Sequence, residues 1–170
     1  MRMFIVLNGP LGIGKSTLAE ALTESIDHCV MINGDLLLAA NPPQPNELDY
    51  LHSTIALLIS HHRRFGYRHF VIEHCWRSPA ELADLRDRLV SIDPGAEIRY
   101  FLLTLPAEEN MRRIKRRQRA RAIDEREFEL RVFAEERDIL GKTSGLGEAF
   151  DVSAPPSELV TLMLSRLELR

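Results

Sequence analysis

The sequence predicts an α/β fold in which a five-stranded parallel sheet carries helices on both faces. Short apolar runs alternate with longer segments whose apolar residues recur at helical spacing, a pattern typical of parallel strands joined by right-handed crossover helices. The chain has 170 residues, 45% of them hydrophobic, which suffices for one complete core and is short for two. We therefore expect a single domain over residues 1–170.

The first expected strand leads into a glycine-rich loop. Met3–Leu7 is an unbroken apolar run, as expected of a strand that is buried on both faces. The following segment, Asn8–Thr17, contains the complete pattern Gly-x-x-x-x-Gly-Lys-Ser. Leu18, Leu22 and Ile26 then recur at helical spacing. A strand, a loop of this pattern and a helix in this order predict a phosphate-binding loop.

The chemistry of this loop predicts how it would bind ATP. Glycines allow the backbone to turn tightly, so that its N–H groups and the positive end of the helix dipole face the phosphates. We expect Lys15 to reach the β and γ oxygens, Ser16 to offer its hydroxyl to Mg²⁺, and Thr17 either to face the α-phosphate or to cap the turn. The expected nucleotide-binding residues of the loop are Gly9, Leu11, Gly12, Ile13, Gly14, Lys15, Ser16 and Thr17.

Two carboxylates follow the second and third expected strands. Cys29–Ile32 precedes Asp35, and Phe70–Ile72 precedes Glu73. Ligands bind at the carboxyl ends of the strands in open parallel sheets, so both side chains are expected beside the phosphates. We predict that Asp35 is the general base, the alternative being a cap on the helix that starts at Leu36. Glu73 is predicted to contact Mg²⁺, the alternative being a structural carboxylate.

The remaining elements continue the alternation of strands and helices. Proline excludes regular structure from Asn41–Asn46, which is predicted to be a loop on the ligand side. The other expected elements are a helix over Leu51–His62, a helix opened by Ser78 and Pro79, a strand over Ile98–Leu103, a helix from Pro106, a loop over Gly141–Gly147, a strand over Phe150–Val152 and a helix from Pro155.

A basic segment follows the fourth strand. Arg112–Arg121 has seven basic residues in ten, and phosphoryl transfer needs two or three arginines to neutralise its equatorial oxygens. Arg113, Arg117 and Arg121 share one helical face at i, i+4 and i+8, so we expect Arg113 and Arg121 to bind the nucleotide and Arg117 to act in catalysis. The segment from residue 112 to roughly 130 is the expected lid. The alternative is a solvated basic face or an RNA-binding patch.

Composition narrows the expected partners. A net charge of −3 gives no general attraction to nucleic acid or anionic membranes, so we do not expect a nucleic-acid partner; the expected partner is the small-molecule acceptor of a phosphoryl group. The two cysteines, Cys29 and Cys75, form no Cys-x-x-Cys pair, which favours a reduced, cytoplasmic setting. No apolar run approaches the roughly 20 residues that span a bilayer, so no membrane association is expected. The sequence does not indicate an oligomeric state.

Taken together, Gly9–Thr17, Gly34-Asp35 and the basic segment resemble the small P-loop kinases over nearly the whole chain. Met31–Asp35 is similar to the end of the second strand in adenylate-kinase-like enzymes. It is also similar to that of zeta toxins, chloramphenicol phosphotransferase and polynucleotide kinases, in which this aspartate takes the proton of the acceptor hydroxyl. Leu103–Arg121 resembles the segment that leads into their arginine-bearing lid. The resemblance implies a P-loop NTPase fold of the kinase type with strand order 2-3-1-4-5. The third strand departs from it, because Glu73 stands where many relatives have aspartate.

The leading functional hypothesis is an ATP-dependent phosphotransferase that moves the γ-phosphoryl group to the hydroxyl of a small molecule. Its catalytic residues would be Lys15, Asp35 and Arg117, with Mg²⁺ held by Ser16 and Glu73. One alternative is a nucleoside monophosphate kinase, in which Asp35 would bind the acceptor, because an ionised phosphate has no proton to lose. Another is a nucleotide-binding switch or an RNA-associated ATPase, although the chain lacks the Asn-Lys-x-Asp motif that reads guanine.

Two further segments carry expectations. His74–Trp76 lies at the predicted active edge and is expected to shape the acceptor pocket. Gly141–Thr143 repeats the Gly-Lys-Thr letters of a phosphate-binding loop without the upstream strand, so we expect a turn beside the adenine.

Overall fold

A parallel sheet runs through the centre of the molecule. The structure, a computed structural model, describes residues 1–117 and 123–169. Its strands lie in the order β2-β3-β1-β4-β5, and every neighbouring pair is parallel. The strands are β1 (Met3–Asn8), β2 (Cys29–Asn33), β3 (His69–His74), β4 (Glu97–Thr104) and β5 (Glu148–Asp151). The predicted fold class and the strand order implied by the resemblance are therefore confirmed.

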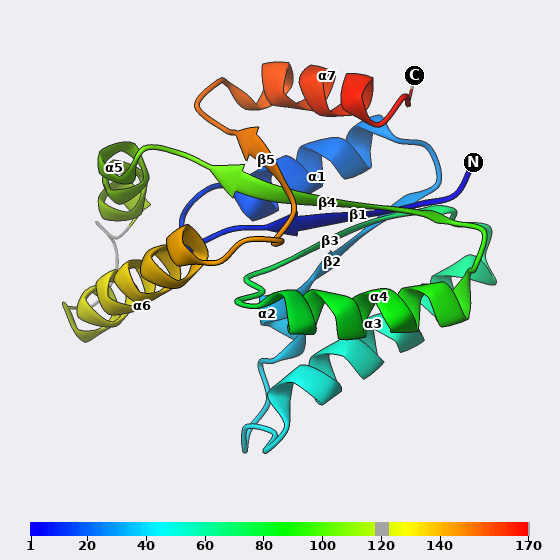
Figure 1. The fold of residues 1–170 in the computed structure, drawn as a ribbon, viewed down its shortest axis with the longest axis horizontal. Coiled ribbons are helices and arrows are strands. Elements are labelled where there is room, and N and C mark those ends of the chain that lie inside the picture. The colour runs from blue at the N-terminus through cyan, green and yellow to red at the C-terminus, as the bar shows by residue number, and fades with distance from the viewer. Residues whose placement is uncertain (118–122, 170) are drawn as a thin grey trace.

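Helices cover both faces of the sheet, as predicted (Figure 1). One face carries α1 (Lys15–Ser25) and α7 (Pro156–Arg166), which pack against each other, and the other carries α3 (Glu47–Arg63) and α4 (Pro79–Ile92). The remaining helices are the single turn α2 (Gly34–Leu37), α5 (Ala107–Arg117) and α6 (Ile123–Lys142). None of the helices in the described ranges has the length and apolar character needed to cross a membrane.

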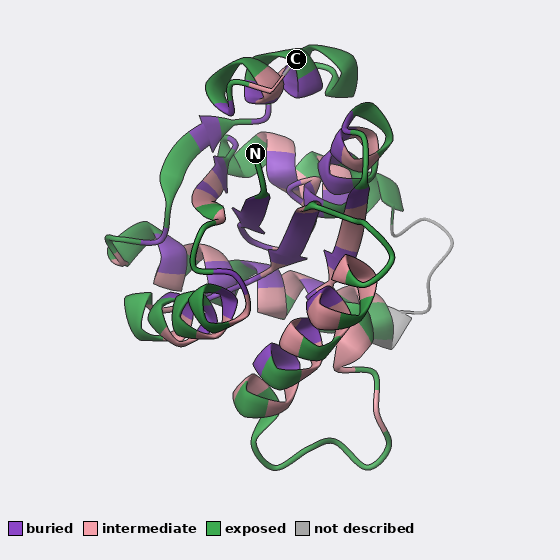
Figure 2. Cartoon of the chain, turned by 90° about the vertical axis from the view of Figure 1, so that its right-hand side faces the viewer, coloured by how far each residue is buried: buried purple, intermediate pink, exposed green. Residues whose placement is uncertain are grey.

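The central strand β1 shows why the sheet has two cores. Its side chains alternate between the faces, as the strand period of two requires. Met3, Ile5 and Leu7 pack with apolar residues of α1 and α7, whereas Phe4 and Val6 pack with those of α3 and α4. All of β1 is buried, and Figure 2 shows this strand at the centre of the molecule with buried helix faces turned toward it. The carboxyl end of β1 is thus a rigid support for the loop that follows.

Capping side chains set several helix boundaries. Ser78 accepts a hydrogen bond from the Glu81 N–H at the start of α4, as its Ser-Pro pair suggests. At the start of α3, Asn46 accepts one from the Asp49 N–H, so this helix begins at Glu47, four residues before the predicted start. The prediction of a turn at Gly141–Thr143 is wrong, because α6 continues through Lys142.

A buried polar chain links α3 and α4 to the end of β3. The indole N–H of Trp76 donates to Nε2 of His52 at 2.9 Å, and Nδ1 of His52 lies 2.6 Å from a carboxylate oxygen of Asp84. An indole nitrogen can only donate, so the His52 proton resides on Nδ1 and is donated to Asp84. Burial lowers the pKa of His52 below its ordinary value of 6.5, which favours the same neutral ring.

Protonation of His52 should destabilise the fold, because the charged ring would place a donor against the Trp76 N–H. The pKa of His52 is lower in the folded chain than in the unfolded chain, so unfolding takes up a proton and stability is lost as the pH falls below about 6.5. His52→Phe should lower the free energy of unfolding by about 1–3 kcal/mol near pH 8. Between about pH 8 and about pH 5.5, the free energy of unfolding of His52→Phe should fall by less than that of the wild type.

Urea unfolding at a series of pH values measures both effects. His61→Phe, at an exposed histidine of the same helix, is the matched control and should behave like the wild type. An identical pH dependence in wild type and His52→Phe would contradict the assignment.

Candidate active site

The loop between β1 and α1 lines a cavity of about 350 Å³ at the carboxyl edge of the sheet. Two of its glycines have left-handed backbone, Gly12 at φ 72° and Gly14 at φ 107°, which other residues rarely adopt. A Cβ atom at Gly12 would also overlap the Ile114 side chain. The loop and the first turn of α1 contribute Leu11, Gly12, Ile13, Gly14, Lys15, Ser16 and Thr17 to the cavity lining, and the expected binding residue Gly9 is not among the lining residues.

Lys15 lies across its own loop. Its side chain is mostly buried, and Nζ donates to the carbonyl oxygens of Gly9 at 2.9 Å and Pro10 at 3.2 Å. These bonds satisfy two of its three donors and hold the ammonium group beside the cavity that it lines. A phosphate in this cavity would meet a cation that is already held in place.

Glu73 and Ser16 bring two oxygen ligands together. The Glu73 carboxylate is 1% exposed and accepts hydrogen bonds from the Ser16 hydroxyl at 2.7 Å and the Asn33 amide at 2.5 Å. Burial raises the pKa of Glu73, while the Ser16 bond and Lys15 oppose that shift. The hydroxyl and the carboxylate are hard oxygen donors of the kind that suit Mg²⁺ when phosphates complete its coordination. Among the described residues, no three His, Cys, Asp or Glu side chains form a metal-binding group by themselves.

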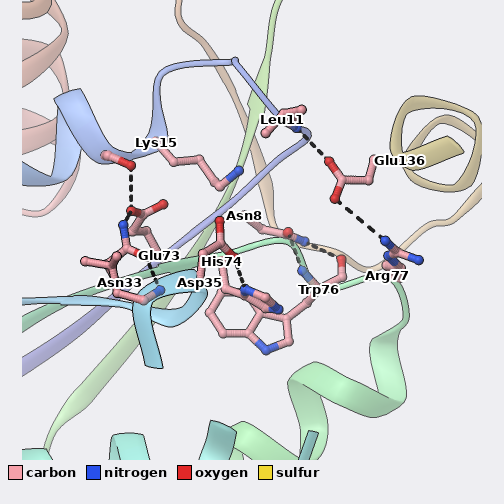
Figure 3. Close-up of polar contacts among 12 residues, drawn as sticks. Asn8, Leu11, Lys15, Asn33, Asp35, Glu73, His74, Trp76, Arg77 and Glu136 are labelled. Carbon is pink, nitrogen blue, oxygen red and sulfur yellow. Dashed lines mark hydrogen bonds and ion pairs between the residues drawn. The ribbon is translucent and has the colours of Figure 1, made fainter. Parts of the chain in front are cut away.

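Asp35 enters the same cavity from α2. Its side chain is 61% exposed, and one carboxylate oxygen lies 2.7 Å from Nδ1 of His74 (Figure 3). This hydrogen bond is the main cause that lowers the pKa of Asp35, so the carboxylate is ionised near neutral pH. The alternative capping role falls to another residue, because the Asn33 side chain accepts the Leu36 N–H. Asp35 is left available to a ligand.

Arg113 and Arg117 line the cavity, and both are already bonded. The Arg113 guanidinium donates to the carbonyl oxygens of Ile13 at 3.2 Å and Val152 at 3.0 Å. Arg117 pairs with the mostly buried carboxylate of Glu129 at 3.0 Å. The third predicted arginine, Arg121, lies outside the described residues.

The sequence analysis did not identify two contacts that hold the loop. The Asn8 side chain accepts from the backbone N–H of Trp76 at 2.9 Å and donates to its carbonyl at 3.0 Å. Glu136 of α6 accepts the Leu11 N–H at 2.7 Å, with Arg77 at 3.7 Å on the other side (Figure 3). The position of Asn8 immediately before the glycine motif was the one available signal. Glu136 offered none, since its partner is 125 residues away in the sequence.

A parallel sheet of order 2-3-1-4-5, with a phosphate-binding loop after its central strand and carboxylates at the neighbouring strand ends, defines the fold of the small P-loop kinases. The comparison with family models gives the family itself. Residues 4–140 match the model described as AAA domain, and the chain belongs to this family. A comparison with curated protein sequences found no match.

Solved structures share the fold over almost their full length. A sugar kinase from Janibacter sp. HTCC2649 has a TM-score of 0.70 at 17% identity, covering 99% of this chain and 95% of that one. A gluconokinase from Sinorhizobium meliloti 1021 has a TM-score of 0.64 at 20% identity, covering 98% and 93%. The tunicamycin resistance protein of Deinococcus radiodurans has a TM-score of 0.65 at 15% identity, covering 100% and 98%. At these identities the likeness establishes the fold.

The hydrogen bond from the Leu11 N–H to the Glu136 carboxylate should contribute measurably to stability. Glu136→Ala leaves the loop N–H without its charged acceptor, so we expect the free energy of unfolding to fall by about 1–3 kcal/mol. Glu135→Ala is the matched control, because the contact of Glu135 within the described residues is an exposed ion pair with Arg77, and its loss should cost about 0.5 kcal/mol or less. Urea unfolding compares the two variants, and equal losses would show that the buried contact does not fix the loop.

Proposed function

We propose that this protein is an ATP-dependent phosphotransferase that moves the γ-phosphoryl group to the hydroxyl of a small molecule. One observation supports this most directly. An ionised carboxylate, Asp35, and a phosphate-binding lysine, Lys15, line the same cavity from different strand ends. The sugar kinase and the gluconokinase that share the fold act on hydroxyl compounds by their names, which agrees with this choice of acceptor.

In the proposed mechanism, the loop N–H groups and Lys15 bind the polyphosphate. Mg²⁺, held by Ser16 and Glu73, would neutralise charge on the phosphate oxygens. Asp35 accepts the proton of the acceptor hydroxyl. At the same time the hydroxyl oxygen of the acceptor bonds to the γ-phosphorus, and the bond between the γ-phosphorus and the ADP oxygen breaks. Arg113 binds the nucleotide, and Arg117, the last residue of α5, stabilises the developing charge; both lie within the segment proposed as a lid.

The ionised state of Asp35 favours a hydroxyl acceptor over a nucleoside monophosphate. An anionic phosphate acceptor would be repelled by a carboxylate whose pKa is lowered by His74. A neutral hydroxyl would find in the same carboxylate an acceptor for its proton.

Lys15→Ala should abolish most of the transfer, because it removes a preorganised cation from the phosphates. We expect kcat/KM to fall about 10²-fold or more. The assay follows ADP release with a panel of hexoses, gluconate, shikimate, nucleosides, nucleoside monophosphates, aminoglycosides and chloramphenicol. Lys142→Ala is the control, since this lysine lies at the exposed end of α6 and should keep full activity. An active Lys15→Ala enzyme would overturn the proposed mechanism.

Asp35→Asn distinguishes the two kinds of acceptor. The amide keeps the size of the side chain and cannot take a proton, so transfer to a hydroxyl should slow by about 10²–10⁴-fold. Turnover of a nucleoside monophosphate needs no base and should change little. Near-normal turnover of the variant on a nucleoside monophosphate would therefore favour a nucleoside monophosphate kinase over the hydroxyl kinase.

A further inference from the structure

We propose that His74 is a positioning residue that holds the Asp35 carboxylate in the orientation needed to receive the acceptor proton, and that the buried side chains behind His74 hold its ring. The inference rests on the proposed function, in which Asp35 is the base. It extends the acceptor site from the cavity to a chain of side chains that reaches α4.

Asp35 has little support from its own element. The helix α2 is a single turn, and the Asp35 side chain is 61% exposed. Within residues 1–117 and 123–169, the hydrogen bond from His74 at 2.7 Å is the one that fixes this carboxylate. An exposed aspartate without such a bond would exchange between rotamers, and a base must lie within hydrogen-bond reach of its proton.

His74, by contrast, is well fixed. It is the last residue of β3 and pairs in register with Asn8 of the buried strand β1. Its side chain is 17% exposed and meets the Trp76 ring edge-on, with centroids 5.3 Å apart. Trp76 is fully buried, and its backbone is held on both sides by the Asn8 amide. The mobile partner of the pair is therefore Asp35, and the fixed partner is His74.

Behind His74, the polar chain through Trp76 and His52 continues to Asp84. Each bond in it has one direction, because the indole N–H can only donate and the carboxylate of Asp84 can only accept. The chain thus sets the rotation of the Trp76 ring against which His74 packs. Arg88 extends it by pairing with Asp84 at 3.0 Å, so the support reaches the exposed face of α4.

Gly34 lets the pair form. A Cβ atom at this position would lie 2.9 Å from Cβ of His74, which is closer than real Cβ atoms approach. The missing side chain allows the start of α2 to lie against His74 and brings Asp35 within reach of its ring. Glycine is thus needed here for close approach, since its backbone has no positive φ.

The hydrogen bond leaves one oxygen of Asp35 free. An ionised carboxylate carries no proton, so Nδ1–H of His74 donates to Oδ1. The Oδ2 atom then remains for the acceptor hydroxyl. With its pKa lowered, Asp35 is unprotonated at neutral pH whether or not it is well placed. What His74 adds is orientation.

Two substitutions separate the hydrogen bond from the packing. His74→Phe keeps an aromatic ring against Trp76 and loses the donor, whereas His74→Asn places an amide nitrogen near the position of Nδ1 and keeps it. We expect His74→Phe to lower kcat for the best acceptor of the panel about 10- to 100-fold with an unchanged KM for ATP. His74→Asn should restore most of that loss, and His61→Phe is the matched control at an exposed histidine.

A double-mutant cycle tests whether His74 acts through Asp35. In the Asp35→Ala background, His74→Phe should have no further effect on kcat, since the carboxylate to be oriented is absent. The same fold loss in both backgrounds, or a wild-type kcat in His74→Phe, would overturn the inference.

Nitrogen NMR of the His74 ring provides a readout that needs no acceptor. We expect the wild type to carry the proton on Nδ1 and the Asp35→Ala variant to shift it to Nε2. The same His74 tautomer in the wild type and in Asp35→Ala would overturn the inference even in an active enzyme. An intact pair in a protein that phosphorylates no member of the panel would instead overturn the proposed function.

Discussion

The site depends on the carboxyl end of β1, which is held in place by the buried strand before it and by the hydrogen bonds of the Asn8 side chain. The strand is buried along its whole length, and the Asn8 side chain bonds the loop that follows β1 and the segment that follows β3. A buried amide that satisfies both an N–H and a carbonyl costs nothing in unpaired groups, and it fixes two backbones at once. The loop backbone and the His74–Trp76 segment therefore keep one geometry relative to each other. The cavity that the loop lines depends on that geometry.

The two carboxylates at this edge have opposite pKa shifts, which suits different tasks. The His74 hydrogen bond lowers the pKa of Asp35, whereas burial raises that of Glu73. When the environments of two neighbouring titratable groups shift their pKa values in opposite directions, the groups commonly have different chemical roles. Asp35 stays ionised and open to the cavity. Glu73 is a buried carboxylate whose negative charge a cation would stabilise, which agrees with the proposed Mg²⁺ role of Glu73 and Ser16.

The sequence was sufficient to predict the strands and the loop because both depend on local patterns, whereas the strand order came from the resemblance to the small P-loop kinases. Apolar runs of strand length and the Gly-x-x-x-x-Gly-Lys-Ser spacing need no knowledge of distant residues. The start of α3 was missed although Asn46 carried a readable cap signal. The contact of Glu136 with Leu11 could not be predicted, since it joins residues 125 positions apart. The partnership of His74 with Asp35 was equally hidden, because it depends on a sheet register and on the missing side chain of Gly34.

Arg113 and Arg117 differ in the contacts that a phosphate would have to replace. Arg113 donates to the neutral carbonyl oxygens of Ile13 and Val152, and its ion pair with the Glu109 carboxylate, 3.6 Å from Nε, is partly exposed and therefore weak. Arg117 faces the carboxylate of Glu129, and a phosphate must compete with that ion pair. A contact that replaces this ion pair accelerates transfer only where it is stronger in the transition state than with bound ATP. This contrast agrees with the proposed division in which Arg113 contributes to nucleotide binding and Arg117 to the transfer step.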